Sequence, residues 1–281
     1  MNGEFDGKRA IVTGGTQGLG EAVAAHFARN GASGLVITGR NQERGEAVRN
    51  ALSVHDCEVV FVAADLRSVD ACREVVQTAR NHFDRIDHLV NCAADTRRST
   101  IVDTSEQFLD DMMAVNFRAP FFLMQETVRW MIEKKVEGSI VNVLSTAMHC
   151  GQPFLAAYSP SKAALAGLTK NTAFALLKNR IRVNGIAPGW IDTPGEHAIQ
   201  KAAHDAPDDW LEKAEAGQVF GRLLKPEEVA RAIGFMCSPA SGLMTGAIVD
   251  FDQTVLGGWE TQPQPVAPFE VSYGGARSGR R

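Results

Sequence analysis

The stretch Thr13-Gly-Gly-Thr-Gln-Gly-Leu-Gly20 follows directly on a short apolar run, Arg9–Thr13, and leads into a segment with helical periodicity. Glycines between a buried strand and a helix allow a tight turn, and they let a pyrophosphate approach the helix N-terminus, where free N–H groups favour negative charge. The spacing Gly14-x-x-x-Gly18-x-Gly20 differs from the common G-x-G-x-x-G, and a purely structural turn could use the same glycines. Because this turn follows the first strand, it favours a nucleotide-binding α/β fold.

The rest of the chain repeats this alternation of strand and helix. Runs that are continuously apolar, as strands buried on both faces of a sheet are, occur at Arg9–Thr13, Leu35–Thr38, Val59–Ala63, His88–Asn91, Ser139–Val143, Ile181–Ile186 and Ala247–Asp250. Helical periodicity lies between them at Leu19–Asn30, Gln42–Ser53, Asp70–His82, Ser105–Glu133, Ala157–Leu177 and Pro226–Cys237. The alternation predicts an α/β fold with a Rossmann-type doubly wound parallel sheet of about seven strands and helices on both faces.

Composition along the chain favours one domain. No linker-like change occurs before residue 258, so we expect a nucleotide-binding catalytic domain over residues 1–258. Within it, Pro188–Arg222 is long and polar around one helix-like piece, Trp210–Ala216, and is predicted to be a substrate loop. Residues 259–281 carry prolines, glycines and arginines, which predicts an extended or disordered tail or an arm laid on a partner subunit.

Charge and hydropathy exclude several classes of function. The 29 Lys and Arg against 33 Asp and Glu give a net charge of −4, which leaves no basic excess for nucleic acid. No apolar run reaches the roughly 20 residues of a membrane span, and the first residues lack the features of a signal peptide, so we expect a cytoplasmic protein. No metal site is expected, because the five cysteines form no C-x-x-C pair and His197 and His204 lack a third ligand.

A second signal is Tyr158-Ser-Pro-Ser-Lys162. A spacing of four places Tyr158 and Lys162 one turn apart on the same helix face. A free tyrosine titrates near pH 10, and a neighbouring ammonium lowers that pKa, which makes the phenol usable as an acid or a base. A tyrosine and a lysine four residues apart also occur by chance on solvated helices. The pair alone is therefore weak evidence for a catalytic role, and the residues around it decide the interpretation.

Those neighbours follow other predicted strands. Ser145 comes after the strand Ser139–Val143, Asn91 ends the preceding strand, and Pro188-Gly189 follows the sixth. Carboxyl ends of parallel strands meet at one edge of the sheet, where open α/β folds bind ligands. Asn116 is the exception, since it lies within the long predicted helix.

At this point the sequence resembles the short-chain dehydrogenase/reductase family in its compact single-domain branch, from about Lys8 to Ile248. The glycine-rich turn matches the family's T-G-x-x-x-G-x-G, and Asn116, Ser145, Tyr158 and Lys162 match its catalytic tetrad in order and spacing. Further similarities to family motifs are found at Asp65-Leu66, Leu89-Val-Asn-Cys-Ala-Ala94, Pro188-Gly-Trp-Ile-Asp-Thr193, Gly221-Arg222, Pro226-Glu-Glu-Val-Ala230 and Thr245-Gly246. Cys92 and Ala94 depart from the family's N-N-A-G, and Asp250-Phe-Asp-Gln253 departs from its usual aspartate and two glycines.

The resemblance implies a hydride transfer with a nicotinamide cofactor. Tyr158 would exchange the hydroxyl proton, Lys162 would lower its pKa and bind the nicotinamide ribose, Ser145 would bond the reacting oxygen, and Asn116 would support a water-linked path to Lys162. The residues expected to bind the cofactor are Gly14, Thr16, Gln17, Gly18, Leu19, Gly20, Arg40, Asp65, Leu66, Asn91, Ala93, Tyr158, Lys162, Pro188, Gly189, Ile191 and Thr193.

The end of the second strand bears on which nicotinamide is bound. An NAD site usually places a carboxylate on the ribose about 20 residues past the glycine-rich turn, and Gly39 stands there. Arg40 could bind a 2′-phosphate, or it could only stack on adenine beside either cofactor. Gln17 is neutral where NADP-preferring relatives often carry a basic residue. The sequence favours NADP over NAD.

Substrate contacts are expected from Arg97, His149, Trp190 and His197. Charged and hydrogen-bonding groups around these positions favour a small polar substrate such as a sugar, polyol or hydroxy acid, although the same groups could simply face water. Two other classes stay open: a dehydratase or epimerase on this scaffold, and a cofactor-binding sensor. The helices 105–133 and 157–177 carry more apolar residues than one sheet face needs, and the resemblance implies that they are buried in a homotetramer or homodimer.

Overall fold

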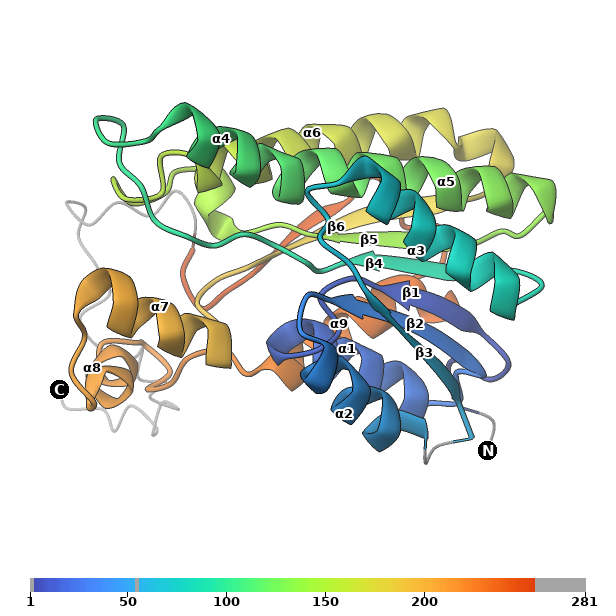
Figure 1. Ribbon diagram of the computed structural model, residues 1–281, viewed down its shortest axis with the longest axis horizontal. Coiled ribbons are helices and arrows are strands. Elements are labelled where there is room, and N and C mark those ends of the chain that lie inside the picture. The colour runs from blue at the N-terminus through green and yellow to red at the C-terminus, as the bar shows by residue number, and fades with distance from the viewer. Residues whose placement is uncertain (1–2, 54–55, 256–281) are drawn as a thin grey trace, which may run out of the picture.

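The computed structural model describes residues 3–53 and 56–255 of the chain, and these residues contain one seven-stranded sheet (Figure 1). Its strands are β1 Arg9–Val12, β2 Gly34–Gly39, β3 Glu58–Ala63, β4 His88–Asn91, β5 Ser139–Val143, β6 Arg182–Pro188 and β7 Ile248–Phe251. All pairs are parallel, in the order β3-β2-β1-β4-β5-β6-β7. The predicted strands and the Rossmann-type fold are confirmed.

Helices cover both faces of this sheet. They are α1 Gly18–Arg29, α2 Gln42–Leu52, α3 Val69–His82, α4 Glu106–Met113, α5 Ala119–Glu133, α6 Tyr158–Ala175, α7 Pro194–His204, α8 Trp210–Ala216 and α9 Pro226–Cys237. In Figure 1, α1, α2 and α9 lie below the sheet, and α3, α5 and α6 lie above it. Each face has its own apolar core: Phe27 and Ile233 belong to the lower one, and Val75, Leu123 and Trp130 to the upper one.

The strand order creates the crevice in which such folds bind their ligands. From β1 the chain runs outward to β2 and β3, then returns to place β4 on the other side of β1. The helices that follow β1 and β4 therefore lie on opposite faces of the sheet, and a gap opens between their N-terminal connections. The glycine-rich turn after β1 and the segment after β4 border this gap.

The predicted helix over Ser105–Glu133 is wrong in one respect. A π-helical turn at Ala114–Arg118 separates α4 from α5. A π turn widens the helix and redirects the side chains within it, and such turns often occur at functional sites. Asn116 lies in this turn and is fully buried.

The segment Pro188–Arg222 is also more regular than expected. The helix-like piece Trp210–Ala216 is present as α8, and a second helix, α7, precedes it. Pro194 at the start of α7 suits its first turn, and the Thr193 hydroxyl caps that turn by accepting from the Glu196 N–H. Every residue of α7 retains some exposure to solvent.

The predicted domain boundary at residue 258 and the tail over 259–281 lie outside the described residues, so that division stays a prediction. Among the described helices, none is long and apolar enough to cross a membrane. The cellular location stays a prediction as well.

A buried histidine sits beneath the sheet at the start of β4. His88 stacks on Phe27 with 5.8 Å between ring centroids, and its Nδ1 lies 2.8 Å from the Ser139 hydroxyl of β5. Burial lowers the pKa of His88 to about 4, because the cation loses its hydration in this aromatic pocket. The neutral ring is therefore the form that the folded protein holds.

This pocket makes stability depend on pH. The folded pKa of His88 lies below the unfolded value of 6.5, so its contribution is complete above pH 6.5 and is lost as pH falls toward 4. Between pH 7.5 and 4.5 we expect wild type to lose about 2.5 kcal/mol more unfolding free energy than His88→Gln. Urea unfolding at both pH values measures the difference, and parallel losses in the two proteins would contradict it.

Candidate active site

A cleft of about 570 Å³ opens at the carboxyl edge of the sheet, beside β1, β2 and β4. Its size is typical of sites for small molecules and cofactors. It is lined by Gly14, Thr16, Gln17, Gly18, Leu19, Gly20, Thr38, Gly39, Arg40, Asn41, Arg44, Ala64, Asp65, Leu66, Arg67, Cys92, Ala93, Ala94, Asp95, Thr96, Arg97, Asp111, Val115, Thr193, Gly195, Glu196 and Ile199. Most of the residues expected to bind a cofactor therefore share one cleft.

The glycine-rich turn forms one end of this cleft and exposes the N-terminus of α1. Gly14 and Gly18 have φ values of +67° and +55°, which a side chain would strain. The residue that precedes α1, Gln17, makes no side-chain cap to the helix. The first N–H groups of α1 therefore face the cleft without a capping side chain, as a pyrophosphate site requires.

The Thr13 hydroxyl joins this turn to the end of β4. It accepts hydrogen bonds from the N–H groups of Cys92 and Ala93, at 3.0 and 3.1 Å. A Cβ added to Gly14 would lie 2.9 Å from the Ala93 Cα, so the two segments touch backbone to backbone. The change from N-N-A-G to Asn-Cys-Ala-Ala leaves this junction intact.

The other end of the cleft, past β2, is positively charged. Arg40 and Arg44 are both exposed there, and Arg44 bonds the Gln17 side chain. A Cβ on Gly39 would collide with the Thr16 hydroxyl, so a side chain carrying a carboxylate does not fit at this position. The buried Thr38 hydroxyl in the same lining has no hydrogen-bond partner among the described residues. This end of the cleft therefore offers positive charge and the Thr38 hydroxyl to a ligand.

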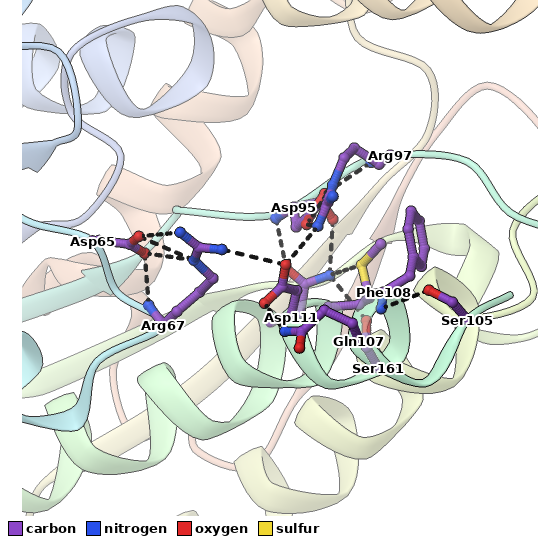
Figure 2. A network of polar contacts seen from close by, with 11 residues as sticks. Asp65, Arg67, Asp95, Arg97, Ser105, Gln107, Phe108, Asp111 and Ser161 are labelled. Atoms are coloured by element: carbon purple, nitrogen blue, oxygen red, sulfur yellow. Dashed lines mark hydrogen bonds and ion pairs between the residues drawn. The ribbon is translucent and has the colours of Figure 1, made fainter.

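A network of ion pairs borders the cleft opposite the glycine-rich turn (Figure 2). Arg67 contacts Asp65 at 2.6 Å and Asp111 at 3.3 Å, and Arg97 contacts Asp95 at 2.6 Å and Asp111 at 3.5 Å. The hydrogen bonds from Arg67 hold the pKa of Asp65 below its usual range. An adenine that reaches the Asp65 carboxylate must therefore compete with Arg67.

The tyrosine and the lysine lie together at the first turn of α6. The Lys162 Nζ is 5.8 Å from the centre of the Tyr158 ring, and it donates to the Val143 carbonyl at the end of β5 at 2.7 Å. Burial raises the pKa of Tyr158 to about 12, although a hydrogen bond with the Ser145 side chain acts in the opposite direction. Burial lowers the pKa of Lys162 to about 8.

This pair lies at the same carboxyl edge of the sheet as the cleft. Cys92, which follows β4, lines the cleft, and Lys162 is bonded to the end of the neighbouring strand β5. Tyr158 and Lys162 themselves do not form part of the cleft wall. Neither do Asn91, Pro188, Gly189 and Ile191, although each was expected to bind the cofactor.

Asn116 is held by direct hydrogen bonds, and its expected water-linked path to Lys162 stays a prediction. Its side chain accepts from the Asp95 N–H at 2.7 Å and donates to the Asp95 carbonyl at 2.9 Å and to the Ser161 hydroxyl at 3.0 Å. None of these bonds reaches Lys162. Asn116 therefore ties the π turn to the loop after β4 and to α6.

Asn91 also points away from the cleft. Its amide donates to the Asn142 side chain of β5 at 2.8 Å, and Asn142 donates to Thr169 of α6 at 2.9 Å. This buried ladder links the sheet to α6. Sequence reasoning missed Asn142, whose position inside an apolar strand was the available signal.

The four expected substrate residues separate in the structure. Arg97 is exposed and paired with Asp95, and His149 is exposed and lies 3.0 Å from Asp250. Trp190 and His197 both belong to the α7 region, where the Trp190 indole donates to Glu196 at 2.9 Å and His197 lies 2.7 Å from Asp192.

The residue after Arg97 is the one that turns inward. Arg98 is largely buried, contacts Glu196, and acts together with it on the pKa of Tyr158. Sequence reasoning missed this orientation, because two adjacent arginines in a loop carry no signal for which of them is buried.

Comparison with known proteins agrees with this geometry. The family model described as "Enoyl-(Acyl carrier protein) reductase" matches residues 14–254. An uncharacterized oxidoreductase from Thermotoga maritima is 37% identical over 248 residues, which cover 88% of this chain and 97% of that protein. A solved structure of a short chain dehydrogenase/reductase family protein is 32% identical with a TM-score of 0.77, covering 89% of this chain and 97% of that one.

The chain belongs to the short-chain dehydrogenase/reductase family. A further solved structure, L-sorbose reductase from Gluconobacter frateurii complexed with NADPH and L-sorbose, is 27% identical with a TM-score of 0.84 and covers 92% of this chain and all of that one. The chain is accordingly an NAD(P)-dependent oxidoreductase, and the resemblance deduced from the sequence motifs is confirmed.

For this short-chain dehydrogenase/reductase, the main residues that sequence reasoning missed at the cofactor cleft are Arg44 and Arg67. Arg44 follows Arg40 by four residues near the start of α2, so helical spacing was an available signal for it. Arg67 follows the Asp65-Leu66 motif directly. Both side chains are brought to the cleft by the carboxyl ends of β2 and β3.

Proposed function

We propose that the chain interconverts a secondary alcohol and a ketone by hydride transfer, on a small polar substrate such as a sugar, polyol or hydroxy acid. The observation that carries the proposal is the buried Lys162 side chain, whose Nζ lies 5.8 Å from the centre of the Tyr158 ring. A nicotinamide cofactor, when bound, supplies the hydride chemistry. The residues of the chain supply the proton and hold the reacting oxygen.

Tyr158 is proposed as the proton donor in the reduction of a ketone. With a pKa of about 12, its phenol is protonated at neutral pH and can give its proton to the oxygen that gains negative charge. Ser145 is proposed to hold that oxygen by a hydrogen bond, and Lys162 to stabilise the phenolate that remains. Asn116 is proposed as a positioning residue, since it fixes the loop after β4 and the start of α6.

The cofactor residues proposed here are Gly14, Thr16, Gln17, Gly18, Leu19, Gly20, Arg40, Arg44, Asp65, Leu66, Ala93 and Thr193, all of which line the cleft. The pyrophosphate would lie at the open N-terminus of α1, and the adenosine ribose beside Thr38. Lys162 is proposed to bind the nicotinamide ribose, with Tyr158 beside it.

We propose NADP as the preferred cofactor over NAD. Arg40 and Arg44 offer two guanidinium groups to a 2′-phosphate, and Gly39 lacks the carboxylate that would bond a 2′-hydroxyl. The NADPH bound in the L-sorbose reductase structure supports the same choice.

The role of Tyr158 is tested by Tyr158→Phe. We expect turnover to fall by roughly 10² to 10⁴-fold because the proton donor is lost, while NADPH binding and the thermal midpoint stay as in wild type. Absorbance at 340 nm over a panel of sugars, polyols and hydroxy acids measures turnover, and product analysis separates an oxidoreductase from a dehydratase or epimerase. A variant that turned over like wild type would refute the assignment; NADPH binding by wild type without any turnover would favour the sensor.

Cofactor choice is tested by the double substitution Arg40→Gln and Arg44→Gln. Loss of two charged hydrogen bonds should weaken NADPH binding by roughly 10 to 100-fold and leave NADH binding nearly unchanged. Fluorescence titration of each nicotinamide gives the dissociation constants. Arg49→Gln, which removes an exposed arginine paired with Glu46 on α2, is the matched control. Tighter binding of NADH than of NADPH by wild type would contradict the proposal.

We propose a homotetramer, with a homodimer as the alternative, because α5 and α6 present apolar side chains to solvent. Phe174 of α6 is 78% exposed, and Leu177, just after α6, is 51% exposed. Ile132 and Phe121 of α5 are 45% and 40% exposed. Other apolar residues of these helices, such as Met124 and Leu165, are buried in the core and are not available for an interface.

Light scattering should give a mass of four, or alternatively two, 30.4 kDa chains. Phe174→Asp should shift that mass toward the monomer, because it places a charge in the buried interface. A monomer peak for wild type at micromolar concentration would exclude this assembly.

A further inference from the structure

One ion pair near Tyr158 is not used by the proposed chemistry. The Arg98 Nη2 lies 3.3 and 3.4 Å from the two carboxylate oxygens of Glu196, and the side chains are only 15% and 14% exposed. Both groups act on the pKa of Tyr158, Arg98 lowering it and Glu196 raising it. A largely buried charged pair costs desolvation, so it calls for a reason beyond stability.

Arg98 is held in place by its neighbours in the chain. Ser99 donates from its N–H to the Phe154 carbonyl at 3.0 Å and accepts from the Ala156 N–H at 3.1 Å, which forms a short parallel bridge. The guanidinium lies 5.7 Å from the centre of the Phe154 ring. The loop that carries Arg98 is thus fixed to the segment that leads directly into Tyr158.

The hydrogen-bonding capacity of Arg98 is not used up. Its contacts to Glu196 are longer than the 2.7–2.9 Å of a good charged hydrogen bond. Nη1 donates to the Thr96 carbonyl at 2.8 Å, and Nε is buried without a partner among the described residues. The Nε and Nη2 groups of Arg98 can therefore donate hydrogen bonds to an acceptor with better geometry than Glu196.

Glu196, by contrast, has other partners. Its Oε1 accepts from the Trp190 indole at 2.9 Å and from the Gln200 amide at 2.7 Å. The Glu196 carboxylate would therefore keep two hydrogen bonds after losing Arg98. The backbone N–H of Glu196 is also bonded to the Thr193 hydroxyl, so Arg98 can leave without disturbing the first turn of α7.

We propose that Arg98 binds a carboxylate of the substrate and takes it over from Glu196, so that the substrates are hydroxy acids and oxo acids. The inference rests on the proposed alcohol–ketone chemistry at Tyr158. The reacting carbon lies at the phenol, and the acid group is bound by the guanidinium beside it, in a bidentate pair that Glu196 does not make. Arg98 is a specificity residue in this scheme. The Glu196 carboxylate pairs with Arg98 until the carboxylate of the substrate replaces it.

The test compares acids with neutral compounds of equal length. Sodium aldonates of four to six carbons and the matching alditols are oxidised with NADP⁺, and kcat/KM is measured for wild type and Arg98→Gln. We expect wild type to prefer the acids, and Arg98→Gln to lose roughly 100-fold more on acids than on alditols, beyond any loss that both share through Tyr158. Arg98→Lys keeps the charge without the fork and should lose about tenfold.

Two further variants separate a specificity role from a general structural one. Glu196→Gln removes the competing charge and keeps an acceptor for Trp190, so the KM for acids should fall. Arg49→Gln removes one exposed positive charge far from this pair and should leave the acid-to-alditol ratio as in wild type. Equal losses on acids and alditols in Arg98→Gln, with an unchanged KM in Glu196→Gln, would overturn the proposal.

A binding measurement covers the case in which no panel member is turned over. Tryptophan emission of the NADPH-bound protein is followed on addition of aldonate or alditol, since Trp190 bonds Glu196 directly. An emission change with aldonate that is absent in Arg98→Gln and in Trp190→Phe supports the site. No change with aldonates, or the same change with both classes, overturns it. Absent turnover together with an Arg98-dependent signal would instead count against the alcohol–ketone chemistry alone.

Discussion

The hydroxyl of Thr13, which accepts two backbone hydrogen bonds from the end of β4, is the contact on which the rest of the site depends. It joins the two strands on either side of the point where the strand order reverses. Its neighbour Gly14 then approaches the Ala93 backbone so closely that a methyl group would not fit. With this junction closed, the α1 N-terminus faces one side of the cleft and the loop after β4 faces the other.

A second junction links that loop to α6. Asn116 bonds both backbone groups of Asp95 and the Ser161 hydroxyl, and Ser161 in turn donates to the Tyr158 carbonyl at 2.6 Å. The π turn that contains Asn116 therefore positions the tyrosine helix through hydrogen bonds rather than through packing alone. A buried network that is fully bonded in this way favours one arrangement over its alternatives.

Much of this could be predicted from the sequence, because its signals are local. Strands buried on both faces are continuously apolar, and the glycine-rich turn and the tyrosine–lysine spacing need only a few neighbouring residues. The π turn could not be predicted, because Asn116 obtains its partners from Asp95 and Ser161, which are distant in sequence. The inward orientation of Arg98 could not be predicted for the same reason. It depends on the bridge between Ser99 and residues 154–156, which are distant in sequence. Helix α7 was not predicted, because Pro194 and Gly195 at its start are residues typical of loops.

Helix α7 connects the cleft with one ion pair beside it. Thr193, Gly195, Glu196 and Ile199 line the cleft, and Glu196 also contacts Arg98. The opposite wall is fixed by the bridge at Ser99, whereas every α7 residue keeps some exposure and is less firmly packed. A movement of α7 would therefore alter the cleft and the Arg98–Glu196 ion pair together.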